Sequence, residues 1–186
     1  MSGVLPDDEL WVLSYYRASE LAGALLFGRL ARRTSDGELS IFLTEHFAEE
    51  ARHAWLWTSL IRELGHVPVR ITETYQSHYS REIGIPATIA EVLLLTRVFE
   101  ERIYCHFVRH LERPETHALV KATLKTMLED ERGHLEWVGE RLARYEAEGM
   151  TFLPALGEKY REIDRRIYAE ALECESRLWD FLGMKP

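Results

Sequence analysis

The sequence predicts an all-α protein in which four long helices form a bundle, with one long crossover between the second and third helices and a fifth helix near the C-terminus. Three observations lead to this prediction. Apolar residues recur at spacings of three and four over long stretches, strand-like composition is confined to residues 65–86, and the other links within the bundle are short. Two short links and one link of about 20 residues suit a four-helix bundle with a single crossover.

The first two helices and the crossover are predicted from their boundary residues. A helix is expected over about residues 7–33, after Pro6 and before a turn at residues 34–37. The second helix ends at Gly65, and residues 65–86 carry prolines, glycines and β-branched residues without helical periodicity, so we expect an extended crossover there. The inward face of the second helix is one stripe: Leu39, Leu43, His46, Glu50, His53, Trp57, Leu60 and Leu64.

The third and fourth helices are separated by a proline. The third is expected to start near residues 86–87 and to end near Glu112, because Pro114 cannot continue it. Pro114 is then expected in the first turn of a fourth helix over about residues 115–148, which Gly149 ends. The inward stripe of this fourth helix has charge at its centre: Val120, Leu124, Met127, Glu131, His134, Val138 and Leu142.

A fifth amphipathic helix is expected over about residues 154–181, where it either caps the bundle or forms a homodimer interface. Its apolar set is Tyr160, Ile163, Ile167, Leu172, Leu178 and Trp179. The bundle over about residues 7–148 and this fifth helix are expected to form a single domain spanning residues 1–186, since the length suits one core. Two arginine clusters are interpreted as solvated helix faces: Arg29, Arg32 and Arg33, and then Arg161, Arg165 and Arg166.

Composition and charge argue against several classes of protein. The chain has 23 basic and 31 acidic residues, a formal charge of −8 with neutral histidines, and this acid surplus disfavours nucleic acid as a partner. No apolar run approaches the roughly 18 residues of a membrane-spanning helix, and the first residues lack a secretory pattern, so we expect a cytoplasmic protein. Cys105 and Cys174 form no CxxC pair, which argues against a rubredoxin-type iron site, a zinc ribbon or a disulfide framework.

A faint internal repeat relates the first two helices of the bundle to the next two. Glu20 recurs 80 positions later as Glu100, and the pair Glu50 and His53 recurs 81 positions later. The chain therefore looks like two similar helical hairpins joined by the crossover. Each Glu-x-x-His segment places a carboxylate and an imidazole on one helix face. The six inward polar residues are Glu20, Glu50, His53, Glu100, Glu131 and His134.

These six residues are candidate metal ligands. Four carboxylates buried together would repel one another, at a cost of several kcal/mol for each unpaired ion. Two divalent cations would neutralise the four charges, while the two histidines would bind as neutral imidazoles. Oxygen and nitrogen donors without thiolate suit Fe, Mn or Zn, and the ligand types alone do not choose among them.

Other interpretations of the same residues stay open. A mid-helix glutamate commonly pairs with an arginine, as Glu20 would with Arg17 and Glu100 with Arg97. Because only one of two adjacent glutamates can face the metals, Glu101 is the fallback ligand in the third helix. The tryptophans one turn after the candidate ligand histidines, Trp57 and Trp137, are interpreted as packing residues. Four other histidines are as readily surface residues as buried ones: His78, His106, His110 and His117.

Two features near the candidate ligands have a supporting interpretation. His46 lies on the same stripe as Glu50 and is a candidate to support the ligands. Small residues in the first helix either leave room for a channel or permit close helix packing, of which packing is the preferred interpretation: Ala18, Ala22, Gly23, Ala24 and Gly28.

A glutamate from each of two helices and a Glu-x-x-His from each of the other two resemble the ligand set of the ferritin-like di-iron or di-manganese carboxylate superfamily. The resemblance covers about residues 9–148, with the fifth helix as an extension. Residues 17–24 and 99–104 look like first- and third-helix segments of demethoxyubiquinone hydroxylases. They are also similar to those of rubrerythrins and of bacterial tRNA-modifying di-iron hydroxylases. The rubredoxin CxxC pairs of the best-known rubrerythrins are missing, so the electrons are expected from an external donor.

The resemblance implies a ferritin-like bundle that holds two irons, with manganese or a mixed Mn/Fe pair as alternatives. The six ligands would be its catalytic residues, with bridging carboxylates from Glu50 and Glu131. The two irons would react with O2 or peroxide, and the resemblance names no substrate. We expect an oxidase or hydroxylase that acts on a small organic substrate. One alternative is a rubrerythrin-like peroxide reductase or ferroxidase. The other alternative, from the helical composition alone, is a metal-free helical interaction protein.

Overall fold

The computed structural model describes residues 5–74, 78–84, 86, 88–171 and 176–184, and all regular elements within these ranges are helices. The expected all-α class is therefore confirmed. The chain divides into two compact units: unit 1 comprises residues 1–77 and 117–123, and unit 2 comprises residues 78–116 and 124–186. The helices are α1 (Asp7–Ala31), α2 (Gly37–Glu63), α3 (Tyr79–Glu82), α4 (Ile89–Glu112), α5 (Ala118–Ala147), α6 (Leu153–Ala171) and α7 (Ser176–Leu182).

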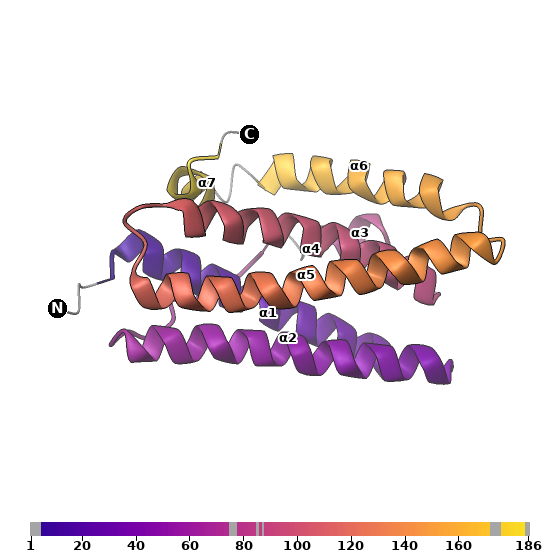
Figure 1. The fold of residues 1–186 in the computed structure, drawn as a ribbon, viewed down its shortest axis with the longest axis horizontal. Helices are drawn as coiled ribbons and strands as arrows, with labels where there is room; N and C mark the ends of the chain where they lie inside the picture. The colour runs from indigo at the N-terminus through magenta and orange to yellow at the C-terminus, as the bar shows by residue number, and fades with distance from the viewer. Residues whose placement is uncertain (1–4, 75–77, 85, 87, 172–175, 185–186) are drawn as a thin grey trace. The chain divides into compact units, whose positions relative to one another are not determined.

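Unit 1 is built on the helical hairpin α1–α2, whose two helices lie side by side (Figure 1). Three acidic residues occupy the first turn of α1, where carboxylates complement the helix dipole. Asp36 caps α2, because its side chain accepts the backbone N–H of Leu39 at 2.9 Å. Gly65, with φ of 83°, follows the end of α2 in a conformation that favours glycine. Both predicted helices are confirmed, with ends within about two residues of those expected.

The crossover is hydrogen-bonded to α1 through the hydroxyl of Ser14. The backbone N–H of Val69 donates to Ser14 Oγ at 2.9 Å, and Ser14 in turn donates to the carbonyl of Leu10 at 2.7 Å. The predicted inward stripe of α2 is buried at its centre, since His53 and Trp57 are both 0% exposed. The centre of the polar stripe of α2 is therefore shielded from solvent.

Unit 2 has different helix starts from those expected. Helix α4 begins at Ile89 because Thr88 and Glu91 form a capping box, in which each side chain bonds to the other residue's backbone N–H. The prediction that Pro114 lies in the first turn of the fourth helix is wrong. Pro114 lies in a turn before α5, where the N–H of Thr116 bonds to the carbonyl of Arg113 at 3.3 Å.

The crossover also contains a helical turn that the sequence did not predict. Helix α3 is four residues long and rests on tertiary contacts. The Tyr79 ring packs edge-on against Phe99 of α4, with centroids 4.5 Å apart, and the Tyr79 hydroxyl donates to Asp164 of α6. An isolated turn of this length is unstable by itself, so periodicity in the sequence gives no sign of it.

In place of the single fifth helix expected over residues 154–181, the structure has α6 and α7, and residues 172–175, which include Leu172, lie outside the described residues. Helix α6 packs along α4 (Figure 1). The other members of the predicted apolar set are buried, as are the apolar members of the α5 stripe. No helix among the described residues combines the length and hydropathy needed to cross a bilayer. The single-domain organisation stays a prediction.

Candidate metal centre

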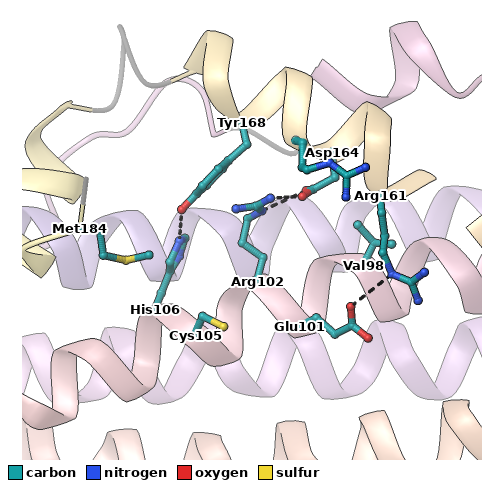
Figure 2. A pocket seen from close by; sticks show the side chains of 10 residues that line it. Val98, Glu101, Arg102, Cys105, His106, Arg161, Asp164, Tyr168 and Met184 are labelled. Atoms are coloured by element: carbon teal, nitrogen blue, oxygen red, sulfur yellow. Dashed lines mark hydrogen bonds and ion pairs between the residues drawn. The ribbon is translucent and has the colours of Figure 1, made fainter. Parts of the chain in front are cut away.

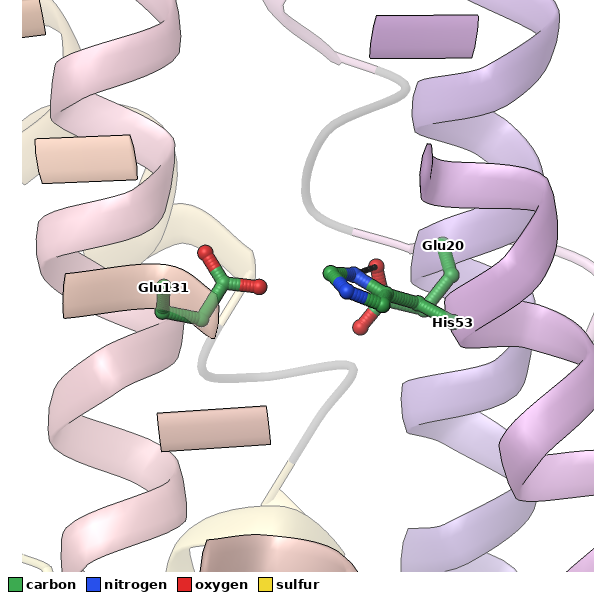
Figure 3. Close-up of side chains that lie close together, drawn as sticks. All are labelled: Glu20, His53 and Glu131. Atoms are coloured by element: carbon green, nitrogen blue, oxygen red, sulfur yellow. Dashed lines mark ion pairs between the residues drawn. The ribbon is translucent and has the colours of Figure 1, made fainter. Parts of the chain in front are cut away.

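In unit 1, α1 and α2 bring one glutamate and one histidine together. Glu20 Oε2 lies 3.8 Å from His53 Nδ1, and the two side chains are 2% and 0% exposed. Figure 3 shows the Glu20 carboxylate beside the His53 ring, each projecting from its own helix. The spacing exceeds an ordinary hydrogen bond of about 2.7–3.2 Å.

Glu50, one turn before His53 on α2, reaches across to α1 at Gly23. A Cβ atom added at Gly23 would lie 2.7 Å from Glu50 Oε2 and 3.2 Å from its carboxyl carbon. Gly23 therefore gives the Glu50 carboxylate its place on α1, one turn after Glu20. The absence of a side chain at Gly23 makes room for the Glu50 carboxylate. The sequence interpretation favours a different role for this small residue, which is close packing of the helices. Glu50 is half-buried.

Unit 2 places the equivalent glutamate and histidine beside each other, together with a second glutamate. Glu100 Oε1 of α4 lies 3.6 Å from His134 Nδ1 of α5, and Glu131 Oε2 lies 3.9 Å from the same nitrogen. One donor atom from each of these three residues lies within 4.8 Å of the other two. Glu100 and Glu131 are buried, and the His134 side chain is 17% exposed.

The neighbouring arginines take partners outside these clusters. Arg17 Nε donates to Thr58 Oγ1 at 2.8 Å, and Arg97 Nε donates to Glu101 Oε1 at 2.8 Å. Glu101 also lies 3.8 Å from Arg161. Of the adjacent glutamates in α4, Glu100 therefore lies at the histidine, whereas Glu101 belongs to an arginine network on another face of the helix.

The donor sets have the chemistry and spacing that a divalent ion requires. Two ligand atoms, each about 2.1 Å from one ion, are at most about 4.2 Å apart. The separations of 3.8 Å between Glu20 and His53 and of 3.6 Å between Glu100 and His134 lie within that limit. In unit 2 the two carboxylates and the imidazole lie within 4.8 Å of one another, so one divalent cation would balance this set. The residues present therefore fit the implied metal.

The contact of His53 Nε2 with Arg52 constrains how His53 can bind a metal ion. His53 Nε2 lies 3.4 Å from Arg52 Nη2. A guanidinium can only donate, and an imidazole that binds a metal through Nδ1 carries its proton on Nε2. Metal binding at Nδ1 therefore requires Arg52 to turn away, which its exposed position on α2 permits.

His46 and the two tryptophans, which the sequence places near the candidate ligands, differ in their surroundings. His46 is buried between the Phe27 and Phe42 rings, at centroid distances of 5.0 and 4.5 Å, and its Nδ1 lies 3.4 Å from Glu49. Trp57 is fully buried and packs against a tyrosine of α1, whereas Trp137 is 42% exposed. The two tryptophans, although equivalent in the repeat, thus occupy unlike surroundings.

Sequence reasoning missed a buried polar network in unit 2. Arg102 of α4 donates two hydrogen bonds to Asp164 of α6: Nε donates to Oδ1 at 3.0 Å, and Nη2 donates to Oδ2. His106 Nε2 lies 2.6 Å from the hydroxyl of Tyr168. Burial, and then the charge of Arg102, lower the pKa of His106 to about 3. A signal for this network was present, since Asp164 interrupts the apolar stripe of α6.

Comparison of the chain with protein-family models, with curated proteins and with solved structures finds no match. The candidate centre therefore rests on the residues and geometry of this chain.

Proposed function

We propose that the two Glu/His clusters together hold a di-metal carboxylate centre, and that the chain is a ferritin-like oxidoreductase that activates O2 or peroxide. One observation carries the proposal. In each helical hairpin, the glutamate of the first helix meets the Nδ1 atom of the histidine of the second helix, at 3.8 Å in unit 1 and 3.6 Å in unit 2. A pair of metal ions in a helical bundle uses a glutamate and a histidine from each hairpin, and this repetition matches that donor set.

The residues divide into two ligand sets. Glu20, Glu50 and His53 would hold one ion, and their equivalents in unit 2 would hold the other, with Glu50 and Glu131 extending to both. Iron is the proposed metal, and manganese or a mixed pair fits the same donors. When bound, the two ions supply the electrons that reduce O2 or peroxide.

The chain's own residues would prepare the centre for this chemistry. The burial of Glu20 and His53 keeps bulk water away from the donors. The imidazoles hold fixed positions because both project from rigid helices. The Glu50 carboxylate lies against Gly23, whose lack of a side chain leaves it room beside α1. With no CxxC pair in the sequence, the electrons come from an external donor.

Access to the donors bears on the substrate class. A small organic substrate is the first candidate, in keeping with an oxidase or hydroxylase. One observation favours the second candidate, a peroxide reductase or ferroxidase. A cavity of unit 2 lies beside α4, and Glu100, Glu131 and His134 do not line it. That cavity offers an organic molecule no route to these donors, whereas peroxide and ferrous ions need little space.

Anaerobic titration with ferrous ions, followed by exposure to O2 with optical monitoring, tests the proposal. Two ions per chain and a new ligand-to-metal absorption band are expected. Less than about one ion per chain, with unchanged protein stability, would favour the metal-free interaction protein. Glu50→Ala and Glu131→Ala are each expected to abolish binding at both positions, and retention of two ions by either variant would contradict the assignment. Peroxide consumption with a reductant, compared with oxidation of organic molecules, separates the two substrate classes.

Localisation and assembly complete the proposal. A cytoplasmic location is proposed, and cell fractionation tests it. The packing of α6 against α4 supports a capping role for the C-terminal helices. If they instead form a homodimer interface, removal of residues from 153 onward would convert a dimer to a monomer in sedimentation velocity.

A further inference from the structure

A cavity of about 310 Å³ lies between α4 and α6 in unit 2 (Figure 2). Its α4 wall is the stripe Val98, Glu101, Arg102 and Cys105, spaced at i, i+3, i+4 and i+7 along one helix face. Glu100 lies on the opposite side of the same helix, toward His134. The cavity is therefore separate from the candidate metal ligands, and its volume is that of a small-molecule site, for which about 300 Å³ is the lower end.

The two carboxylates that line the cavity are already engaged. Asp164 accepts hydrogen bonds from Arg102 and from the Tyr79 hydroxyl. Glu101 accepts a hydrogen bond from Arg97 and lies 3.8 Å from Arg161, as the dashed line in Figure 2 marks. Neither carboxylate is available to a cationic ligand without loss of an existing ion pair.

The arginines that line the cavity outnumber these acids. Arg102, Arg161 and Arg165 face two carboxylates, so the lining carries one excess positive charge. The excess lies at Arg165, which is exposed on α6 and for which the described part of the chain shows no ion pair. His106 adds no charge near neutral pH, because burial and Arg102 keep its pKa at about 3. A guanidinium at the cavity lining without a carboxylate partner is a donor group for an anionic head group.

The remainder of the lining suits a compact apolar body. Tyr168 and Val98 line the cavity from α6 and α4, and Met184 lines it from beyond α7. The Arg102 guanidinium lies 3.3 Å from the centroid of the Tyr168 ring, and the Tyr168 hydroxyl is bonded to His106. These contacts hold the wall in one arrangement, so the cavity is pre-formed.

We propose that this cavity binds a small organic anion, whose carboxylate or phosphate head group is held by Arg165 and whose apolar body lies against Val98 and Tyr168. Arg165 is thus a binding residue, whereas the sequence predicts a solvated helix face for it. The site does not depend on the proposed metal centre, because it lies on the other side of α4 and uses none of the candidate ligands.

Cys105 provides a direct test, because its exposed thiol lines the cavity. A Cys174→Ser background leaves Cys105 as the single thiol, and its alkylation by iodoacetamide is followed with benzoate, phenyl phosphate or benzyl alcohol present. With an anion at about nine times its Kd, alkylation is expected to slow about tenfold, since the reactive fraction falls as 1/(1 + [L]/Kd). Benzyl alcohol, which has the same ring without charge, should protect far less.

Two arginine variants complete the design. Arg165→Gln is expected to remove the protection, whereas Arg144→Gln, which removes an equally exposed charge at the end of α5, should retain it. Circular dichroism of both variants verifies that they fold. Protection by one anion alone identifies the head group and supports the proposal. The absence of protection by both anions, equal protection by benzyl alcohol, or full protection in Arg165→Gln would each overturn it.

Discussion

Replacement of Gly23 by alanine should separate metal binding from folding. Gly23 is a helical residue without a positive φ, so alanine suits its backbone and is expected to stabilise α1 by up to about 1 kcal/mol. The three heavy atoms nearest to the new Cβ all belong to Glu50. The substitution therefore acts on one carboxylate and leaves the rest of the hairpin in place.

The required displacement can be worked from the structure. The new Cβ would lie 2.7 Å from Glu50 Oε2, and ordinary contacts begin at 3.4 Å, so the oxygen must retreat by 3.4 − 2.7 = 0.7 Å. Metal–ligand distances tolerate only about 0.2 Å. We therefore expect metal affinity to fall about 10- to 100-fold, which corresponds to about 1.4–2.7 kcal/mol.

Competitive anaerobic titration with ferrous ions, together with chemical denaturation of the metal-free protein, measures both effects. Gly139→Ala is the matched control, because it makes the same change within α5 where a new Cβ meets nothing within 4 Å. Gly23→Ala should bind metal more weakly than Gly139→Ala while its metal-free form is at least as stable as wild type. Equal metal affinity of the two variants would refute the role of Glu50 as a ligand.

Three further predictions follow from unit 2. Glu100→Gln should lose metal while Glu101→Gln keeps two ions per chain in the same titration, because only Glu100 lies at the histidine. Because the pKa of His106 is lowered from 6.5 to about 3, its contribution to stability is present above pH 6.5 and is lost below it, by up to about 1.4 kcal/mol per pH unit. Denaturation at pH 7 and pH 5 should show a smaller loss in His106→Gln than in wild type. Asp164→Asn should lower the free energy of unfolding by about 1–3 kcal/mol, because Arg102, whose side chain is 17% exposed, loses its charge partner. An unchanged value would mean that water solvates Arg102 instead.

The sequence predicted the elements whose periodicity is strong. The stripes of α2 and α5 are long enough for an inward glutamate or histidine to stand out, and the repeat then pairs Glu20 with Glu100 and His53 with His134. The structure adds the distances from each glutamate to its histidine. The choice of Glu100 over Glu101 rested on the repeat, and the arginine partners of Glu101 now give a physical reason for it.

Features that depend on tertiary contacts were not predictable. Helix α3 exists because Tyr79 packs against Phe99 and bonds to Asp164, contacts separated widely in sequence. The sequence pattern does not distinguish a buried from a surface position for His106. Charged residues such as Arg102 lie on the same face of α4, so this face, which α6 covers, does not have an apolar pattern. Gly23 was noted only as a small residue, since the approach of Glu50 depends on how α1 and α2 pack.

The central claim is that both clusters belong to one di-metal centre. Mössbauer spectroscopy of protein reconstituted with isotope-enriched iron and then oxidised tests it most directly, because it reports both the amount of iron and the magnetic coupling between ions. We predict two ferric ions per chain in a single spin-coupled pair with a diamagnetic ground state. Two magnetically isolated ions, or one ion or fewer per chain, would contradict the claim.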